Sequence, residues 1–112
     1  LGCYGHERVQ TPNLDKLAAR GTRFTAHYTN SPVCIPARAA FATGQYTHET
    51  RYWDNATPYD GAVRSWGHRL GDEGVISESI GKLHYRNKDL DTGFKRQHHP
   101  MHVMNGIGQV WG

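Results

Sequence analysis

The chain contains little cysteine: only Cys3 and Cys34 occur among its 112 residues. The two residues form no C-x-x-C pair, which argues against a zinc knuckle. A single disulfide between them stays open as an alternative. We favour an unpaired Cys34, because the residues around it are typical of a reactive cysteine.

Long apolar runs and dense basic stretches are also missing. No run approaches the roughly 20 apolar residues that a membrane-spanning helix needs, so we expect no membrane span. The formal net charge is +3, from 13 Lys and Arg against 10 Asp and Glu, and the basic residues are interspersed with acids. Nucleic-acid surfaces show a denser basic stripe, so we expect no nucleic-acid partner. The charge balance suits a small anionic substrate or an ordinary solvated surface.

The first third of the chain predicts a loop, a helix and a strand. It begins with Leu1 in a glycine-rich loop, so we expect a segment of a longer chain, and a missing leader then says nothing about compartment. Residues 11–21 predict a short amphipathic helix with a core role, with Thr11 as cap and Pro12 in the first turn. Residues 22–29, β-branched and aromatic, predict a strand.

The pattern C-x-P-x-R at residues 34–38 follows this strand. Pro36 has the φ angle of a first helical turn, so Cys34 is predicted to lie where a loop meets a helix. Arg38 comes one turn later on the same face. A cysteine at a helix N-terminus beside a guanidinium is chemically primed, whereas the alternative is a buried structural cysteine. The strand–loop–helix order favours the functional interpretation.

Further candidates follow in the second half. Residues 45–61 predict a long loop in which Asn55 offers an amide to an anion or simply forms a turn. A helix is predicted from Asp60 or Gly61 to Gly74, and a short strand at residues 75–80.

That strand would deliver Lys82 and His84, which point the same way in an extended chain and can both donate to one anion. The alternative is a solvated lysine and an unrelated histidine. From residue 85 onward we predict loops. They hold a cluster of His98, His99 and His102, for which zinc binding is conceivable and a packing role is favoured.

Three motifs in this order resemble the type I, formylglycine-dependent sulfatases of the alkaline phosphatase-like superfamily. Cys34-x-Pro36-x-Arg38 with Thr43-Gly44 is similar to the family's signature, with alanine at position 37 where many members have serine. Residues 11–15 are similar to the family's first helix, and Gly81-Lys82-Leu83-His84 to its Lys-x-His pair.

The resemblance implies an α/β fold, part of a sandwich with a mostly parallel central sheet flanked by helices. Residues 1–112 would form part of an N-terminal catalytic domain that lacks its first strand and its C-terminal half. The implied activity is hydrolysis of small-molecule sulfate esters. A maturation enzyme, formylglycine-generating or anaerobic, would convert Cys34 to formylglycine, and a divalent metal would bind there: Ca²⁺ first, with Mg²⁺ or Mn²⁺ as alternatives. Only Cys34 matches a metal ligand.

The resemblance also assigns roles. Arg38 would hold and polarise the formylglycine diol, and Lys82 and His84 would bind sulfate oxygens, with His84 a candidate for protonating the leaving group. Asn55 matches, by its distance from Cys34, a polar residue that contacts the anion in related phosphonate monoester hydrolases. The chain alone should be inactive. The alternatives are a phosphonate or phosphate monoester hydrolase of the same superfamily and a non-catalytic metal- or anion-binding module.

Overall fold

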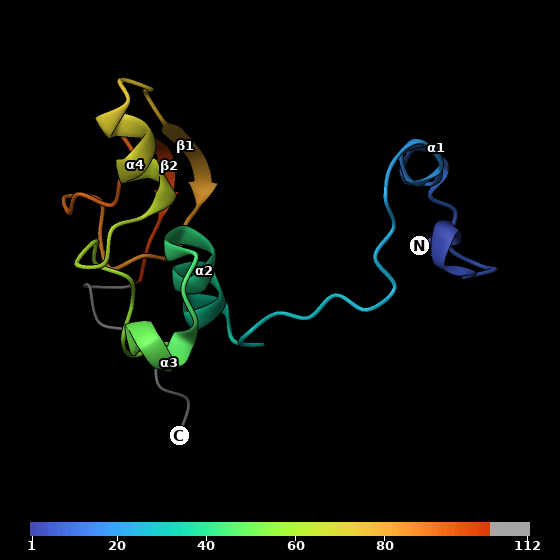
Figure 1. The fold of residues 1–112 in the computed structure, drawn as a ribbon, viewed down its shortest axis with the longest axis horizontal. Coiled ribbons are helices and arrows are strands. Elements are labelled where there is room, and N and C mark those ends of the chain that lie inside the picture. The colour runs from blue at the N-terminus through green and yellow to red at the C-terminus, as the bar shows by residue number, and fades with distance from the viewer. Residues whose placement is uncertain (104–112) are drawn as a thin grey trace.

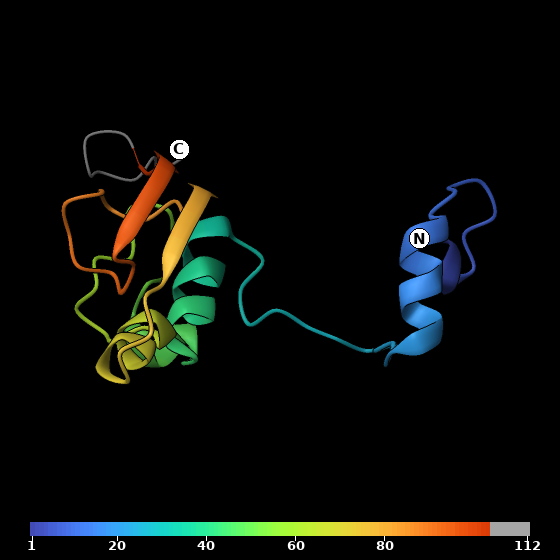
Figure 2. The ribbon, with the colours of Figure 1, turned by 90° about the horizontal axis from the view of Figure 1, so that it is seen from above.

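The computed structural model describes residues 1–103 as short helices and a small parallel sheet. In chain order the elements are η1 (Gly2–Tyr4), α1 (Pro12–Arg20), α2 (Cys34–Thr43), α3 (Thr47–Thr50), α4 (Trp66–Asp72), β1 (Glu78–Lys82) and β2 (Arg96–Met101). The two strands lie side by side in parallel, with α2 beside them (Figure 2). This agrees with the predicted α/β class. No helix in this part of the chain is both long and apolar enough to cross a membrane.

The N-terminal arm, η1 with α1, lies apart from the other elements and is joined to them by an extended segment (Figure 1). Pro12 opens α1, as the sequence predicts. Thr11 ties the arm together, because its hydroxyl accepts from the Gly2 N–H at 2.8 Å and donates to Asp15 at 3.0 Å. The predicted core role is wrong for this structure: Leu17 is 59% exposed, because α1 packs only against η1 among the described elements.

The strand predicted at residues 22–29 is also wrong. This segment is irregular, and Tyr28 is 86% exposed. A strand is stable only when a neighbour takes up its backbone hydrogen bonds. The one sheet in the described part of the chain is the β1–β2 pair, which does not include this segment.

The core lies where α2 meets the loop after α3 and the segment after β1. Its centre is the fully buried ring of Tyr59, which makes edge-on contacts with Tyr52 (5.6 Å between centroids) and Tyr85 (4.8 Å). The Tyr59 hydroxyl donates to the Val63 carbonyl at 2.7 Å, so the buried polar atom is satisfied. Small residues such as Ala39 on α2 allow this close packing.

Element boundaries differ from prediction in the second half. The helix expected from Asp60 starts at Trp66, because Asp60 instead caps a turn by accepting from the Ala62 N–H at 3.1 Å. Ser65 is the N-cap of α4 and accepts from the His68 N–H. The expected strand 75–80 is shifted to Glu78–Lys82.

β2 was not predicted, since residues 85 onward were expected to form loops. Its sequence, Arg-Gln-His-His-Pro-Met, has no apolar alternation and contains a proline, so no strand signal is present. The segment forms a strand because it pairs with β1. In this parallel pair Ile80 lies opposite His98, and the register is irregular between Ile80 and Lys82. Partner availability, rather than local pattern, decides the strand.

The turn that ends at Gly93 is tightly packed against the start of α4, and this predicts an unequal response of two glycines to alanine. Gly93 has φ +93°, and an added Cβ would lie 2.5 Å from both the His68 nitrogen and the Ser65 hydroxyl. Gly74 has φ +76° with open space around it. Gly74→Ala should cost about 1–2 kcal/mol from the left-handed backbone alone. Gly93→Ala should lower the unfolding free energy by about 3 kcal/mol or more, because overpacking adds to the strain. Urea unfolding measures both; equal losses would contradict the close packing.

Candidate active site

Cys34 is the first residue of α2, and its side chain is exposed. Val33 before it is extended, and Gly44 ends the helix at φ +69°. Pro36 is the third helical residue, where its missing N–H leaves no donor unpaired. The predicted loop-to-helix position of Cys34 is confirmed, and the structural alternative of a buried cysteine is not what the fold shows. Both cysteines are free, so no disulfide forms between Cys3 and Cys34.

Asn55 reaches the start of α2 from the loop after α3. Its side-chain oxygen accepts from the Ile35 N–H at 3.2 Å and lies 3.6 Å from the Cys34 sulfur. Asn55 lies in a turn that is stabilised by Asp54. The Asp54 carboxylate accepts from the Ala56 and Thr57 N–H groups at 2.9 and 3.1 Å. Asn55 is therefore more than a turn-former.

Arg38 joins α2 to the end of β1. Its Nη1 donates to the Lys82 carbonyl at 2.7 Å and to the Leu83 carbonyl at 3.4 Å. These partners are backbone atoms, so no sequence signal could have identified them. The bond joins the backbone of the predicted Lys-x-His segment to α2, the helix that begins at Cys34.

Lys82 and His84 are brought together by a turn and not by an extended strand. Lys82 is the last residue of β1, and His84 has φ +60°, so the argument from strand alternation is wrong. The His84 N–H donates to the Met101 carbonyl at 2.8 Å, which fixes this turn against β2. Burial, and then the charges of Lys82, Arg38 and His102, hold the pKa of His84 below its usual value.

Two members of the predicted histidine cluster, His98 and His102, have side-chain partners within the fold. His98 lies 2.9 Å from a Glu78 oxygen, and His102 lies 2.8 Å from the Gln97 side-chain oxygen. Throughout residues 1–103, His, Cys, Asp and Glu side chains nowhere gather in a group of three that could hold a metal ion. The described residues thus do not fit a calcium site, which needs six to eight oxygen ligands.

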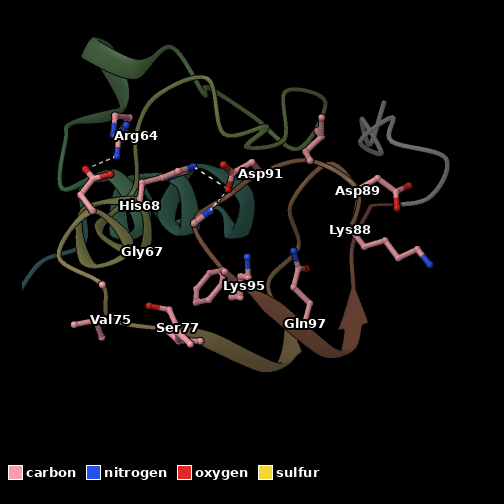
Figure 3. A pocket seen from close by; sticks show the side chains of 17 residues that line it. Arg64, Gly67, His68, Val75, Ser77, Lys88, Asp89, Asp91, Lys95 and Gln97 are labelled. Atoms are coloured by element: carbon pink, nitrogen blue, oxygen red, sulfur yellow. Dashed lines mark hydrogen bonds and ion pairs between the residues drawn. The ribbon is translucent and has the colours of Figure 1, made fainter.

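Two hollows border these elements. The smaller, about 440 Å³, is mostly apolar and is lined by Cys34 and Arg38 together with Phe41, Trp66 and Leu83. The larger, about 780 Å³, lies between α4 and residues 88–97 (Figure 3). Its wall carries two ion pairs, Arg64–Asp72 and His68–Asp91, and none of the predicted site residues. Size alone therefore does not mark the site.

A family model described as Sulfatase matches residues 1–110. The chain belongs to the sulfatase family. It is 39% identical over 89 residues to choline-sulfatase of Rhizobium meliloti, which covers 80% of this chain and 17% of that protein. It is 35% identical over 123 aligned residues to human steryl-sulfatase, covering 99% of this chain and 20% of that protein. The chain thus spans a fifth or less of these two sulfatases.

Solved structures show the same relationship. A Bacteroides fragilis protein described as a sulfatase superposes with a TM-score of 0.68 at 35% identity, covering 76% of this chain and 20% of that one. A phosphonate monoester hydrolase of Agrobacterium radiobacter superposes with a TM-score of 0.71 at 23% identity, covering 93% and 23%. The second likeness shows the fold alone. Together they confirm the expected sulfatase and alkaline phosphatase-like architecture.

Sequence reasoning missed the residues that hold the site in place. Asp54 and Thr57 form the turn behind Asn55, and a carboxylate accepting from the N–H groups two and three residues later is a recognisable local pattern. Asp60 accepts from the Tyr52 hydroxyl at 2.8 Å and lies 3.6 Å from Arg86. These contacts join distant segments, and no spacing rule indicates them.

The charges around His84 predict a titration experiment. Lys82→Met removes a neighbouring positive charge, so the pKa of His84 should rise toward its usual value. Lys95→Met removes the same charge from the wall of the larger hollow and should leave His84 unchanged. Histidine-ring NMR shifts followed against pH in the metal-free protein measure both. An unchanged His84 titration in Lys82→Met would contradict the proximity of the two side chains.

Proposed function

We propose that the protein containing this chain hydrolyses sulfate esters, with the residue at position 34 as nucleophile after oxidation of Cys34 to formylglycine. One observation carries the proposal: the loop that carries Asn55 and the end of β1 both contact the first half of α2, the helix that begins at Cys34. Asn55 lies 3.6 Å from the Cys34 sulfur, and Arg38 holds the Lys82 carbonyl at 2.7 Å. Membership in the sulfatase family supports the same chemistry.

The modification explains why a cysteine stands at this position. A hydrated aldehyde at position 34 supplies two hydroxyl groups, one to attack sulfur and one whose deprotonation lets sulfate leave; an unmodified thiol cannot do this. A maturation enzyme that oxidises the thiol is therefore a partner in the proposal. Exposure of the Cys34 side chain at the helix start leaves it open to substrate.

Lys82 and His84 are proposed to bind the sulfate oxygens. The Lys82 ammonium is exposed, and His84 next to it has a lowered pKa, so its imidazole is neutral near pH 7 before substrate binds. A bound sulfate group brings negative charge, which raises the pKa of the histidine and equips it to protonate the departing alcohol. Loss of one such donor should cost roughly 3 kcal/mol of transition-state stabilisation.

Arg38 is proposed to hold the segment that carries Lys82 and His84 in a fixed position relative to residue 34. Its Nη1 is used by the carbonyls of Lys82 and Leu83, so the guanidinium fixes the segment that carries both donors. The same cation lowers the pKa of His84. Its expected contact with the diol at position 34 is part of the proposal.

A divalent metal belongs to the proposal, with Ca²⁺ first and Mg²⁺ or Mn²⁺ as alternatives. Residues 1–103 supply no cluster of three or more metal-ligating side chains. Cys34 as formylglycine is the proposed ligand from this chain. The carboxylates that a hard cation prefers would have to come from other residues of the protein.

A phosphonate or phosphate monoester is the second candidate substrate. Two observations favour testing it: the superposition on the Agrobacterium radiobacter enzyme, and the placement of Asn55 beside Cys34. Sulfate and phosphonate esters have similar tetrahedral anionic groups, so both classes belong in the same assay. The Lys82-x-His84 pair leads us to expect sulfate as the preferred group.

Formylglycine itself is detected by mass. Trypsin releases residues 24–38 as one peptide containing Cys34. After co-expression with a maturation enzyme, this peptide should be lighter by roughly 18 Da, because the thiol has been oxidised to an aldehyde. The Cys34→Ala variant supplies the unmodified control. A peptide that keeps the full thiol mass after co-expression would count heavily against the proposal.

Activity is predicted to depend on one of the two cysteines. In the matured full-length protein, Cys34→Ala should abolish hydrolysis of an arylsulfate, whereas Cys3→Ala, in the separate η1 segment, should retain it. The same preparations assayed with an aryl phosphonate ester show which anion is preferred. The isolated 112 residues should turn over neither substrate; calcium-dependent turnover by them would overturn this expectation.

A further inference from the structure

The first turn of α2 lacks the side-chain cap that normally accepts from a backbone N–H group at the start of a helix. The first N–H groups of any helix lack partners within it, and a polar N-cap side chain normally supplies one. Here the N-cap is Val33, which makes no side-chain cap, and Pro36 has no N–H to satisfy. The first backbone donation to an earlier carbonyl is from Ala37 to Val33 at 3.0 Å. The Ile35 N–H therefore needs a partner from elsewhere, and Ile35 is 1% exposed, so solvent is a poor one.

Asn55 supplies that partner from 20 residues away. Its Oδ1 accepts from the Ile35 N–H at 3.2 Å and lies 3.6 Å from the Cys34 sulfur. One oxygen thus contacts both the backbone of the helix start and the side chain that becomes the nucleophile. A hydroxyl at position 34 is a stronger donor than a thiol, so maturation would strengthen this contact.

The loop that carries Asn55 is itself fixed on both sides. On the N-terminal side Asp54 accepts from two following N–H groups, and the buried Tyr52 donates to Asp60 at 2.8 Å. On the C-terminal side Pro58 and Tyr59 are fully buried. Asn55 is therefore presented by a rigid turn, as a group that positions another residue must be.

We propose that Asn55 is a positioning residue, whose side-chain oxygen completes the first turn of α2 and sets the direction of the side chain at position 34. The inference rests on the proposed function, because it takes position 34 as the nucleophile. It differs from an anion contact in the atom that matters: positioning uses the oxygen, whereas binding of sulfate would use the amide NH₂.

Asn55→Asp separates the two roles, because it keeps the oxygen and removes the NH₂. In the matured full-length protein, with rates normalised to formylglycine content, Asn55→Ala should lower kcat by about 100-fold, the cost of a misplaced reacting group, with KM within about threefold. Asn55→Asp should recover kcat to within about tenfold of wild type while raising KM, because the carboxylate repels sulfate. A kcat for Asn55→Asp at or below that of Asn55→Ala would overturn the proposal.

Asn87→Ala is the matched control. Asn87 also accepts through its side-chain oxygen from two backbone N–H groups, those of Asp89 and Leu90 at 3.0 and 3.2 Å. The substitution removes the same atoms from a turn outside the site. It should leave kcat and KM unchanged, and a loss equal to that of Asn55→Ala would show that both substitutions act only through stability.

Amide exchange tests the contact without relying on turnover. In the unmodified protein, the Ile35 amide should exchange at least about fivefold faster in Asn55→Ala, because one hydrogen bond has been lost, and at the wild-type rate in Asn55→Asp and Asn87→Ala. Unchanged Ile35 exchange in Asn55→Ala would overturn the positioning role whatever the activity. A wild-type protein that hydrolyses no sulfate ester would instead overturn the proposed function, while the exchange result still decides the contact.

Discussion

The bond from Arg38 to the Lys82 carbonyl is the contact on which the arrangement of the site depends. It joins residues 44 apart in sequence, one on α2, the helix that begins at Cys34, and one at the end of β1. A charged donor to a carbonyl is stronger than a neutral one, and it is directional enough to fix two elements at one point. Nothing in the sequence of the Lys-x-His segment indicates that its backbone lies against α2. Tyr52 and Tyr59, in the loop that also carries Asn55, pack in one buried cluster with Ala39 and Ala42 of the same helix.

The sequence could predict what is local. The start of α2 and the opening of α1 at Pro12 follow from the backbone preferences of proline, and the structure confirms them. The C-x-P-x-R pattern and Lys82 with His84 pointed to the correct family because motifs in sequence order are specific. The elements that failed depend on neighbours. Residues 22–29 have strand composition and no partner strand, whereas β2 has a partner and no strand composition.

The site shows the same division at the level of single atoms. Residue types indicated which groups we propose for the chemistry, but several of their contacts use the backbone: Arg38 donates to carbonyls, Asn55 accepts from an N–H, and His84 donates its own N–H to Met101. Backbone atoms are the same in every residue, so spacing and composition carry no information about them. The metal that the family resemblance implies illustrates the opposite limit. Carboxylate side chains are common ligands of Ca²⁺, and residues 1–103 contain no group of three His, Cys, Asp or Glu side chains that could hold a metal ion.

The left-handed backbone of His84 affects how substitutions there should be interpreted. A residue at φ +60° carries steric cost unless it is glycine or a short polar residue such as asparagine, and a β-branched side chain fits worst. An alanine at this position would lose the imidazole and also change the backbone preference of the turn that presents Lys82. Asparagine would remove the ring while leaving that turn favourable. The two substitutions together would separate the chemical contribution of the histidine from the shape of the peptide that carries it.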